Sequence, residues 1–108
     1  MSADKIRTEL VDNLLGAFAQ IDEKDGVYAL LQDLCTVREI TEMSQRLEVA
    51  RLLAQGTSYL EIQQQTGVSA TTISRVSKCL NYGSGGYERA LETLENPPSA
   101  PESHKEER

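Results

Sequence analysis

The sequence predicts an all-α fold, because helical hydrophobic periodicity and helix-capping residues recur along the chain and no strand pattern interrupts them. The 108 residues include no Trp and one Phe, so Leu, Ile, Val and Ala must supply most of the packing. A chain of this length can bury one modest core, and we expect a single domain over residues 1–96. Residues 97–108 are polar and contain all three prolines, which predicts a disordered tail.

Two helices are expected in the N-terminal third. The first runs from about Ala3 to Gln20, where apolar side chains recur every three or four residues. Its apolar face is wider than a lone surface helix requires, so we expect part of this face to pack on a second copy of the chain. A compact monomeric bundle is the alternative. The second helix is short, follows Asp25–Gly26 and ends near Leu34.

The middle helix has the clearest boundaries. Thr36 and Glu39 have the spacing of a capping box, in which each side chain accepts a hydrogen bond from the backbone N–H of the other residue. Apolar residues continue at helical spacing to Leu53. Gly56 should end the helix, because a C-cap favours the left-handed conformation that glycine adopts readily.

Residues Ser58 to Leu80 are predicted to form a helix-turn-helix. Ser58 caps a short helix over residues 59–65, and a second helix begins after the cap residue Ser69 and runs to about residue 82. Gly67 lies in the turn between them, where a positive backbone dihedral is expected. A last helix over residues 87–95 follows the glycine-rich break at 83–86. The apolar stripe that should join the two helices of the motif consists of Ile62, Val68, Ile73, Val76 and Leu80.

The outward face of the second helix of this motif is polar and carries two cations. Small hydroxyl and methyl groups at the start of such a helix can approach base edges in the major groove of DNA. Longer cationic side chains farther along can reach phosphates. A helical hairpin with a solvated polar face is the alternative interpretation. The predicted DNA-binding residues are Ser69, Ala70, Thr71, Thr72, Ser74, Arg75 and Lys78.

A negative net charge, here −6, is unusual for a protein that binds double-stranded DNA, but the acidic residues are concentrated outside the predicted helix-turn-helix. Residues 1–35 carry a net charge of −4, whereas residues 58–83 carry +1. This distribution predicts weak non-specific DNA binding and a need for well-placed contacts. The acidic N-terminal third also suits a basic protein partner, so a helical interaction module without DNA binding is the alternative function.

Other classes of function lack the residues that they require. The single histidine, His104, lies in the polar tail, and Cys35 and Cys79 are far apart, so we expect neither a metal site nor an enzyme. Both cysteines are expected to be reduced, partly buried thiols. No apolar segment approaches the ~20 residues of a membrane span, and the first residues lack a signal-peptide core, so we expect no membrane association and a cytoplasmic location.

The segment ISRVSKCLNYG at residues 73–83, with QRLEVA at residues 45–50 and Gly67, resembles the Trp repressor-like family and within it the YerC/YecD-type branch. The likeness covers about residues 5–95. It implies a fold of the Trp repressor type, an intertwined helical homodimer with a helix-turn-helix DNA-binding domain. It also implies a sequence-specific transcriptional regulator, expected to be a repressor, whose two recognition helices enter successive major grooves of a near-palindromic operator.

The type member of that family binds L-tryptophan between its central and recognition helices. Two of the matching positions differ here, because Val76 and Cys79 stand where the family pocket has a glycine and a serine. Added bulk and the absence of a polar partner argue against tryptophan as a ligand. We therefore expect no cofactor, with L-tryptophan or another small effector as the open alternative. The pocket positions that the resemblance retains are Thr36, Arg46, Thr72 and Arg75.

Overall fold

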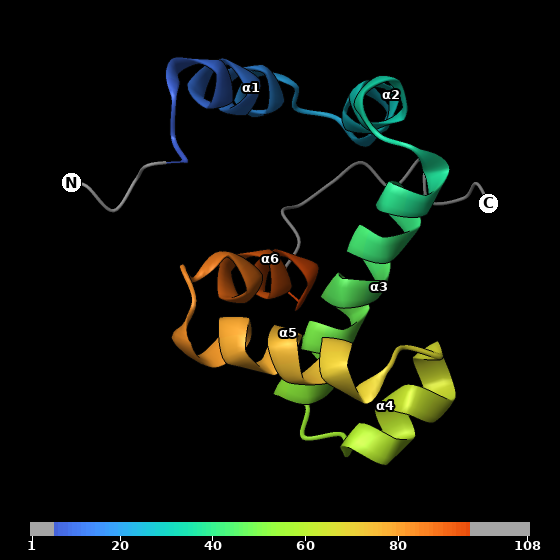
Figure 1. The fold of residues 1–108 in the computed structure, drawn as a ribbon. Coiled ribbons are helices and arrows are strands. Elements are labelled where there is room, and N and C mark those ends of the chain that lie inside the picture. Colours follow the sequence, from blue (N-terminus) through green and yellow to red (C-terminus); the bar gives the residue numbers. More distant parts are fainter. Residues whose placement is uncertain (1–5, 96–108) are drawn as a thin grey trace. The chain divides into compact units, whose positions relative to one another are not determined.

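The computed structural model describes residues 6–95, which form six α-helices and no β-strand (Figure 1), so the all-α prediction is confirmed. The predicted tail at residues 97–108 lies outside the described residues. No helix within residues 6–95 is both long and apolar enough to cross a membrane. The helices are α1 (Glu9–Gln20), α2 (Lys24–Leu34), α3 (Val37–Ala54), α4 (Tyr59–Thr66), α5 (Ala70–Tyr82) and α6 (Gly86–Glu95).

The chain divides into two compact units, one within residues 1–41 and one within residues 42–108. The first unit holds α1, α2 and the start of α3, and the second holds the rest of α3 with α4, α5 and α6. The expectation of one domain over residues 1–96 remains a prediction.

Helix α1 begins later than its apolar pattern suggests. The hydroxyl of Thr8 accepts a hydrogen bond from the backbone N–H of Val11 at 3.2 Å, so Thr8 is the N-cap and Glu9 the first helical residue. The expected start near Ala3 is therefore wrong, and Ile6 precedes the helix. A threonine hydroxyl that accepts a hydrogen bond from a free N–H of the first turn sets the N-terminal boundary of the helix, even where apolar residues precede it.

Helix α2 begins earlier than expected, at Lys24, so Asp25 and Gly26 lie inside it. A Cβ at position 26 would come within 2.7 Å of the Cγ2 atom of Ile21. Glycine allows the chain before the helix to approach it closely here. Its cost of about 1 kcal/mol relative to alanine is too small to break the helix.

Both ends of α3 are as predicted. The backbone N–H of Thr36 donates to Oε1 of Glu39 at 2.8 Å, and the N–H of Glu39 donates to Oγ1 of Thr36 at 3.0 Å, which completes the capping box. At the other end Gly56 has a φ of +88°, and its N–H donates to the carbonyl of Leu53 at 3.0 Å.

The core of the second unit joins its four helical segments, and the predicted helix-turn-helix is part of it. Ile62 of α4 and Ile73 of α5 are completely buried, while Val68 and Leu80 pack at the edge of the same cluster. Gly67 follows α4 with a φ of +76°, a conformation that glycine adopts without steric cost. Helix α4 ends at Thr66, one residue beyond the expected end. The buried side chains are Val49, Ala50, Leu52, Ile62, Ile73, Val76 and Leu91.

The turn from α5 to α6 depends on Gly83. Its N–H donates to the carbonyl oxygen of Cys79 at 2.8 Å, and a Cβ at position 83 would lie far inside the contact distance of that same oxygen. The chain can therefore turn back closely here because residue 83 has no side chain. Helix α6, which begins at Gly86, then packs along α5 (Figure 1) and buries Leu91.

We expect Gly83→Ala to lower the free energy of unfolding by about 1–3 kcal/mol, because the added methyl group must push the end of α5 aside. Thermal unfolding followed by circular dichroism, at one fixed protein concentration, should show a melting temperature at least about 4 °C lower. Gly86→Ala is the matched control, since a Cβ at position 86 meets nothing within 4 Å. Equal melting temperatures for the two variants would contradict this account of the turn.

Candidate nucleic-acid interface

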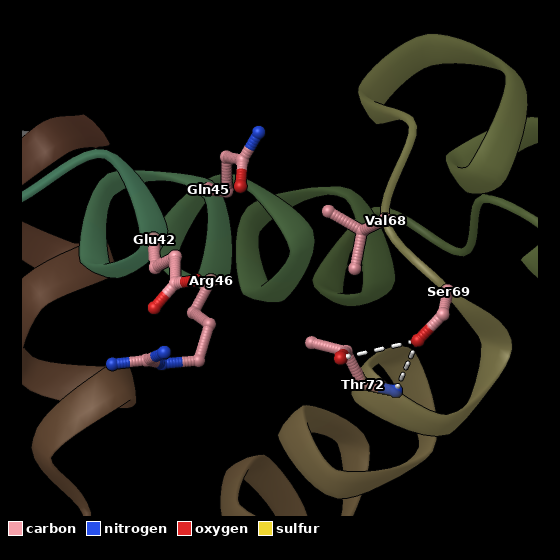
Figure 2. Close-up of a pocket in the computed structure, with 6 residues that line it drawn as sticks. All are labelled: Glu42, Gln45, Arg46, Val68, Ser69 and Thr72. Atoms are coloured by element: carbon pink, nitrogen blue, oxygen red, sulfur yellow. Dashed lines mark hydrogen bonds between the residues drawn. The ribbon is translucent and has the colours of Figure 1, made fainter. Parts of the chain in front are cut away.

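Helix α5 begins at a capping serine that also fixes the first turn. The hydroxyl oxygen of Ser69 accepts a hydrogen bond from the N–H of Thr72 at 3.2 Å, and its O–H donates to Oγ1 of Thr72 at 3.2 Å (Figure 2). Thr72 is half-buried. Of the predicted DNA-binding residues, Ser69 and Thr72 are therefore bonded to one another at the start of the helix.

The other predicted residues are exposed on α5, away from its buried side. The side chains of Ile73 and Val76 are 0% and 2% exposed, which fixes the rotation of the helix about its axis. Residues at the opposite side of the helix then face outward, because an α-helix repeats every 3.6 residues. We call this surface the outer face of α5. Thr71, Arg75 and Lys78 lie on it with Ser74 at its edge, and we include Ala70, which is exposed as the first residue of the helix; all five are exposed.

The charges of the outer face are available to a ligand. Within residues 6–95 neither Arg75 nor Lys78 forms an ion pair, and α5 contains no acidic residue. Arg51 of α3 differs, because its guanidinium binds the carboxylate of Glu48 at 2.6 Å. That hydrogen bond raises the pKa of Arg51 and lowers the pKa of Glu48. The cation of Arg51 is thus neutralised locally, whereas the two cations on α5 can approach phosphates.

Two cavities lie between α3 and the helices of the motif, and they share Arg46 and Thr72. In Figure 2, Arg46 and Glu42 extend from the same side of α3. No ion pair joins these two side chains in the described part of the chain, although their spacing would permit one. The smaller cavity, of about 270 Å³, is lined by Glu42, Gln45, Arg46, Val68, Ser69 and Thr72.

The larger cavity brings together most of the expected effector residues. Thr36 belongs to the first unit and is not among the lining residues. Tyr87 lines the cavity but is not among the residues that the sequence predicts there. Its only sequence signal is an aromatic residue directly after the glycine-rich break. The cavity measures about 410 Å³ and is lined by Arg46, Thr72, Arg75, Val76, Cys79 and Tyr87.

The two cysteines differ in their surroundings. Cys35 is half-buried, as expected, whereas Cys79 is exposed, and both are free thiols. The expectation of partial burial is thus wrong for Cys79. This residue lies on α5 between its buried stripe and its outer face, so the core does not cover it.

The fold and the outer face of α5 define a small helical protein of the helix-turn-helix class. The family model described as Trp repressor protein matches residues 9–95. The chain is 44% identical over 94 residues to the uncharacterized protein YerC of Bacillus subtilis, a match that covers 87% of this chain and 90% of that protein. This chain belongs to the Trp repressor family, a family of DNA-binding regulators.

Solved structures agree with this assignment. A TrpR-like protein from Eubacterium eligens is 41% identical, and its fold matches with a TM-score of 0.80 over 89% of this chain and 99% of that chain. A protein from Staphylococcus aureus matches with a TM-score of 0.80 at 38% identity, over 88% of this chain and 95% of that chain. The expected YerC-type relationship and the all-helical, helix-turn-helix fold of the Trp repressor type are confirmed for the single chain.

Proposed function

We propose that this protein is a transcriptional repressor that binds a near-palindromic DNA operator as a homodimer. The observation that carries the proposal is the outer face of α5, which the packing of the second unit leaves uncovered. Among residues 6–95 its two cations form no ion pair, and it carries no acidic side chain. An α-helix of this kind fits the major groove, which is about 12 Å wide. The residues proposed to contact DNA are Ser69, Ala70, Thr71, Thr72, Ser74, Arg75 and Lys78.

The chemistry of the outer face suggests how the contacts are divided. Ala70 and Thr71 are short and lie in the first turn of α5, so the backbone can approach base edges closely there. Arg75 and Lys78 lie one and two turns farther along, where they can pair with phosphates. The logarithm of the association constant falls linearly with the logarithm of the salt concentration, with a slope of about −0.9 for each phosphate that the protein neutralises. Two cations on each of two helices therefore account for a slope of about −3.6 at most.

The first experiment selects duplexes from a random DNA library with the purified protein and measures their affinity by fluorescence anisotropy. We expect Thr71→Ala to weaken binding of a selected duplex by about fivefold, and to weaken binding of a scrambled duplex much less. Lys78→Ala should weaken binding of both duplexes. It should also make the salt slope shallower by about 0.9 for each phosphate that the lysine neutralises in the unmodified protein.

Arg89→Ala is the charge-matched control, because it removes a cation from α6 and leaves α5 intact. It should leave affinity and salt slope near those of the unmodified protein. The assignment of the outer face is wrong if Thr71→Ala and Lys78→Ala bind the selected duplex as well as the unmodified protein does. Absence of selected DNA at low salt would favour the protein-interaction module instead.

The first unit supports the homodimer. Neither α1 nor α2 buries a side chain, and Leu10 of α1 is 80% exposed. A 12-residue helix such as α1 is marginal in water without tertiary packing. The same unit also exposes Val37 at the start of α3, at 81%. Burial of these side chains against a second copy would supply the apolar contacts that one chain lacks.

We expect sedimentation equilibrium to give a mass twice the 11.9 kDa of one chain. Leu10→Asp should shift the protein toward the monomer, because it places a charge in the proposed apolar interface. Leu94→Asp is the control, since Leu94 is an exposed leucine of α6 in the second unit, at 55%. A monomeric unmodified protein, or equal dissociation constants for the two variants, would exclude this interface.

We propose further that DNA binding does not require L-tryptophan. Val76 lines the larger cavity with a β-branched side chain that is already held in the core, at 2% exposure. Cys79 offers only a weak hydrogen-bond partner for an ammonium group. Isothermal titration of the protein with L-tryptophan should therefore give no saturable heat, and the amino acid should leave operator affinity unchanged. A saturable heat would overturn this expectation and restore Arg46, Thr72 and Arg75 as effector-binding residues.

A further inference from the structure

The last residue of α5 is exposed to an unusual degree. Tyr82 is 85% exposed, more than any other large apolar or aromatic side chain within residues 6–95. The chain turns back directly after it at Gly83, and α6 packs against α5 through Leu91 on the core side. The described residues of the second unit therefore leave this aromatic ring uncovered.

Tyr82 continues the outer face of α5. Thr71, Arg75, Lys78 and Tyr82 follow one another at intervals of four, three and four residues, which places them along one side of the helix. The buried residues Ile73 and Val76 lie on the other side. An aromatic side chain thus stands at the C-terminal end of the surface that we propose to enter the major groove.

We propose that Tyr82 is a further DNA-contacting residue, which donates its phenolic O–H to a phosphate bordering the groove that holds α5. This inference rests on the proposed DNA binding. From Thr71 to Tyr82 the helix rises by about 16 Å. The major groove is only about 12 Å wide, so a helix with its first turn at the bases extends its last turn to the sugar–phosphate backbone.

The chemistry of tyrosine suits that position. The carbonyl groups at the C-terminus of a helix carry partial negative charge, which disfavours a phosphate close to the backbone. A phenol holds its O–H at the end of a rigid ring, away from those carbonyls, and it is a neutral donor. Because α5 supplies only two cations, neutral hydrogen-bond donors must provide part of the affinity for the DNA backbone.

The test compares Tyr82→Phe and Tyr82→Ala on a duplex selected from a random library by the unmodified protein. Removal of the hydroxyl group should weaken binding by about tenfold, and removal of the ring should weaken it at least as much. The salt slope should stay unchanged in both variants, because neither substitution removes a cation. Lys78→Ala provides the contrast, since it should change the slope. Circular dichroism and sedimentation confirm that each variant is folded and assembled as the unmodified protein is.

Two matched controls remove similar groups elsewhere. Tyr28→Phe removes a hydroxyl group from a tyrosine of α2 that is 54% exposed, and Leu94→Ala truncates an exposed side chain of α6. Both should bind the selected duplex with unchanged affinity. Phosphate-ethylation interference should show one fewer sensitive phosphate in each half-site for Tyr82→Phe than for the unmodified protein.

The outcomes separate this inference from the proposed function. If the unmodified protein selects no DNA, the proposed function fails and the inference fails with it. If the unmodified protein binds DNA and Tyr82→Ala binds equally well, only the role of Tyr82 is excluded. An altered sedimentation coefficient with unchanged DNA affinity would instead assign the exposed ring to a contact between protein molecules.

Discussion

Burial of Ile73 and Val76 on one side of α5 is the constraint on which the candidate interface depends. These side chains lie in the cluster that also holds Ile62 of α4 and Leu91 of α6, so α5 packs against both of these helices. A rotation of α5 by one residue, about 100°, would carry a polar side chain into this cluster and expose an isoleucine. The outward direction of Thr71 and the residues in line with it therefore follows from hydrophobic packing, before any ligand is considered.

The sequence predicts well those features that depend on residues three or four positions apart. The capping box of Thr36 and Glu39 and the cap at Ser69 have the expected partners, because a cap is formed by one side chain and the N–H groups of the next turn. The apolar stripe that joins the two helices of the motif was predictable for a similar reason. Two short helices that meet at Gly67 bury their apolar residues when these faces pack against each other, and helical spacing identifies those faces.

Features that depend on contacts between distant segments were predicted less well. The place of Tyr87 at the larger cavity depends on the return of α6 along α5. This contact does not follow from periodicity within one helix. The exposure of Cys79 has the same origin, since it is determined by which part of α5 its neighbours leave open. Likeness to the family located Arg46 and Arg75 at one cavity, a pairing that no local pattern contains.

The division of α5 into a buried side and an outer face has an evolutionary consequence. Thr71, Ser74, Lys78 and Tyr82 hold no position in the core, so substitutions there cost little stability. Folding therefore constrains mainly Ile73 and Val76, whereas the proposed DNA contacts would constrain the exposed positions. Relatives that share this fold at about 40% identity can therefore differ on the outer face of this helix while the scaffold stays the same. Redesign of the sequence preference should likewise begin at Ala70 and Thr71, the positions proposed to approach base edges.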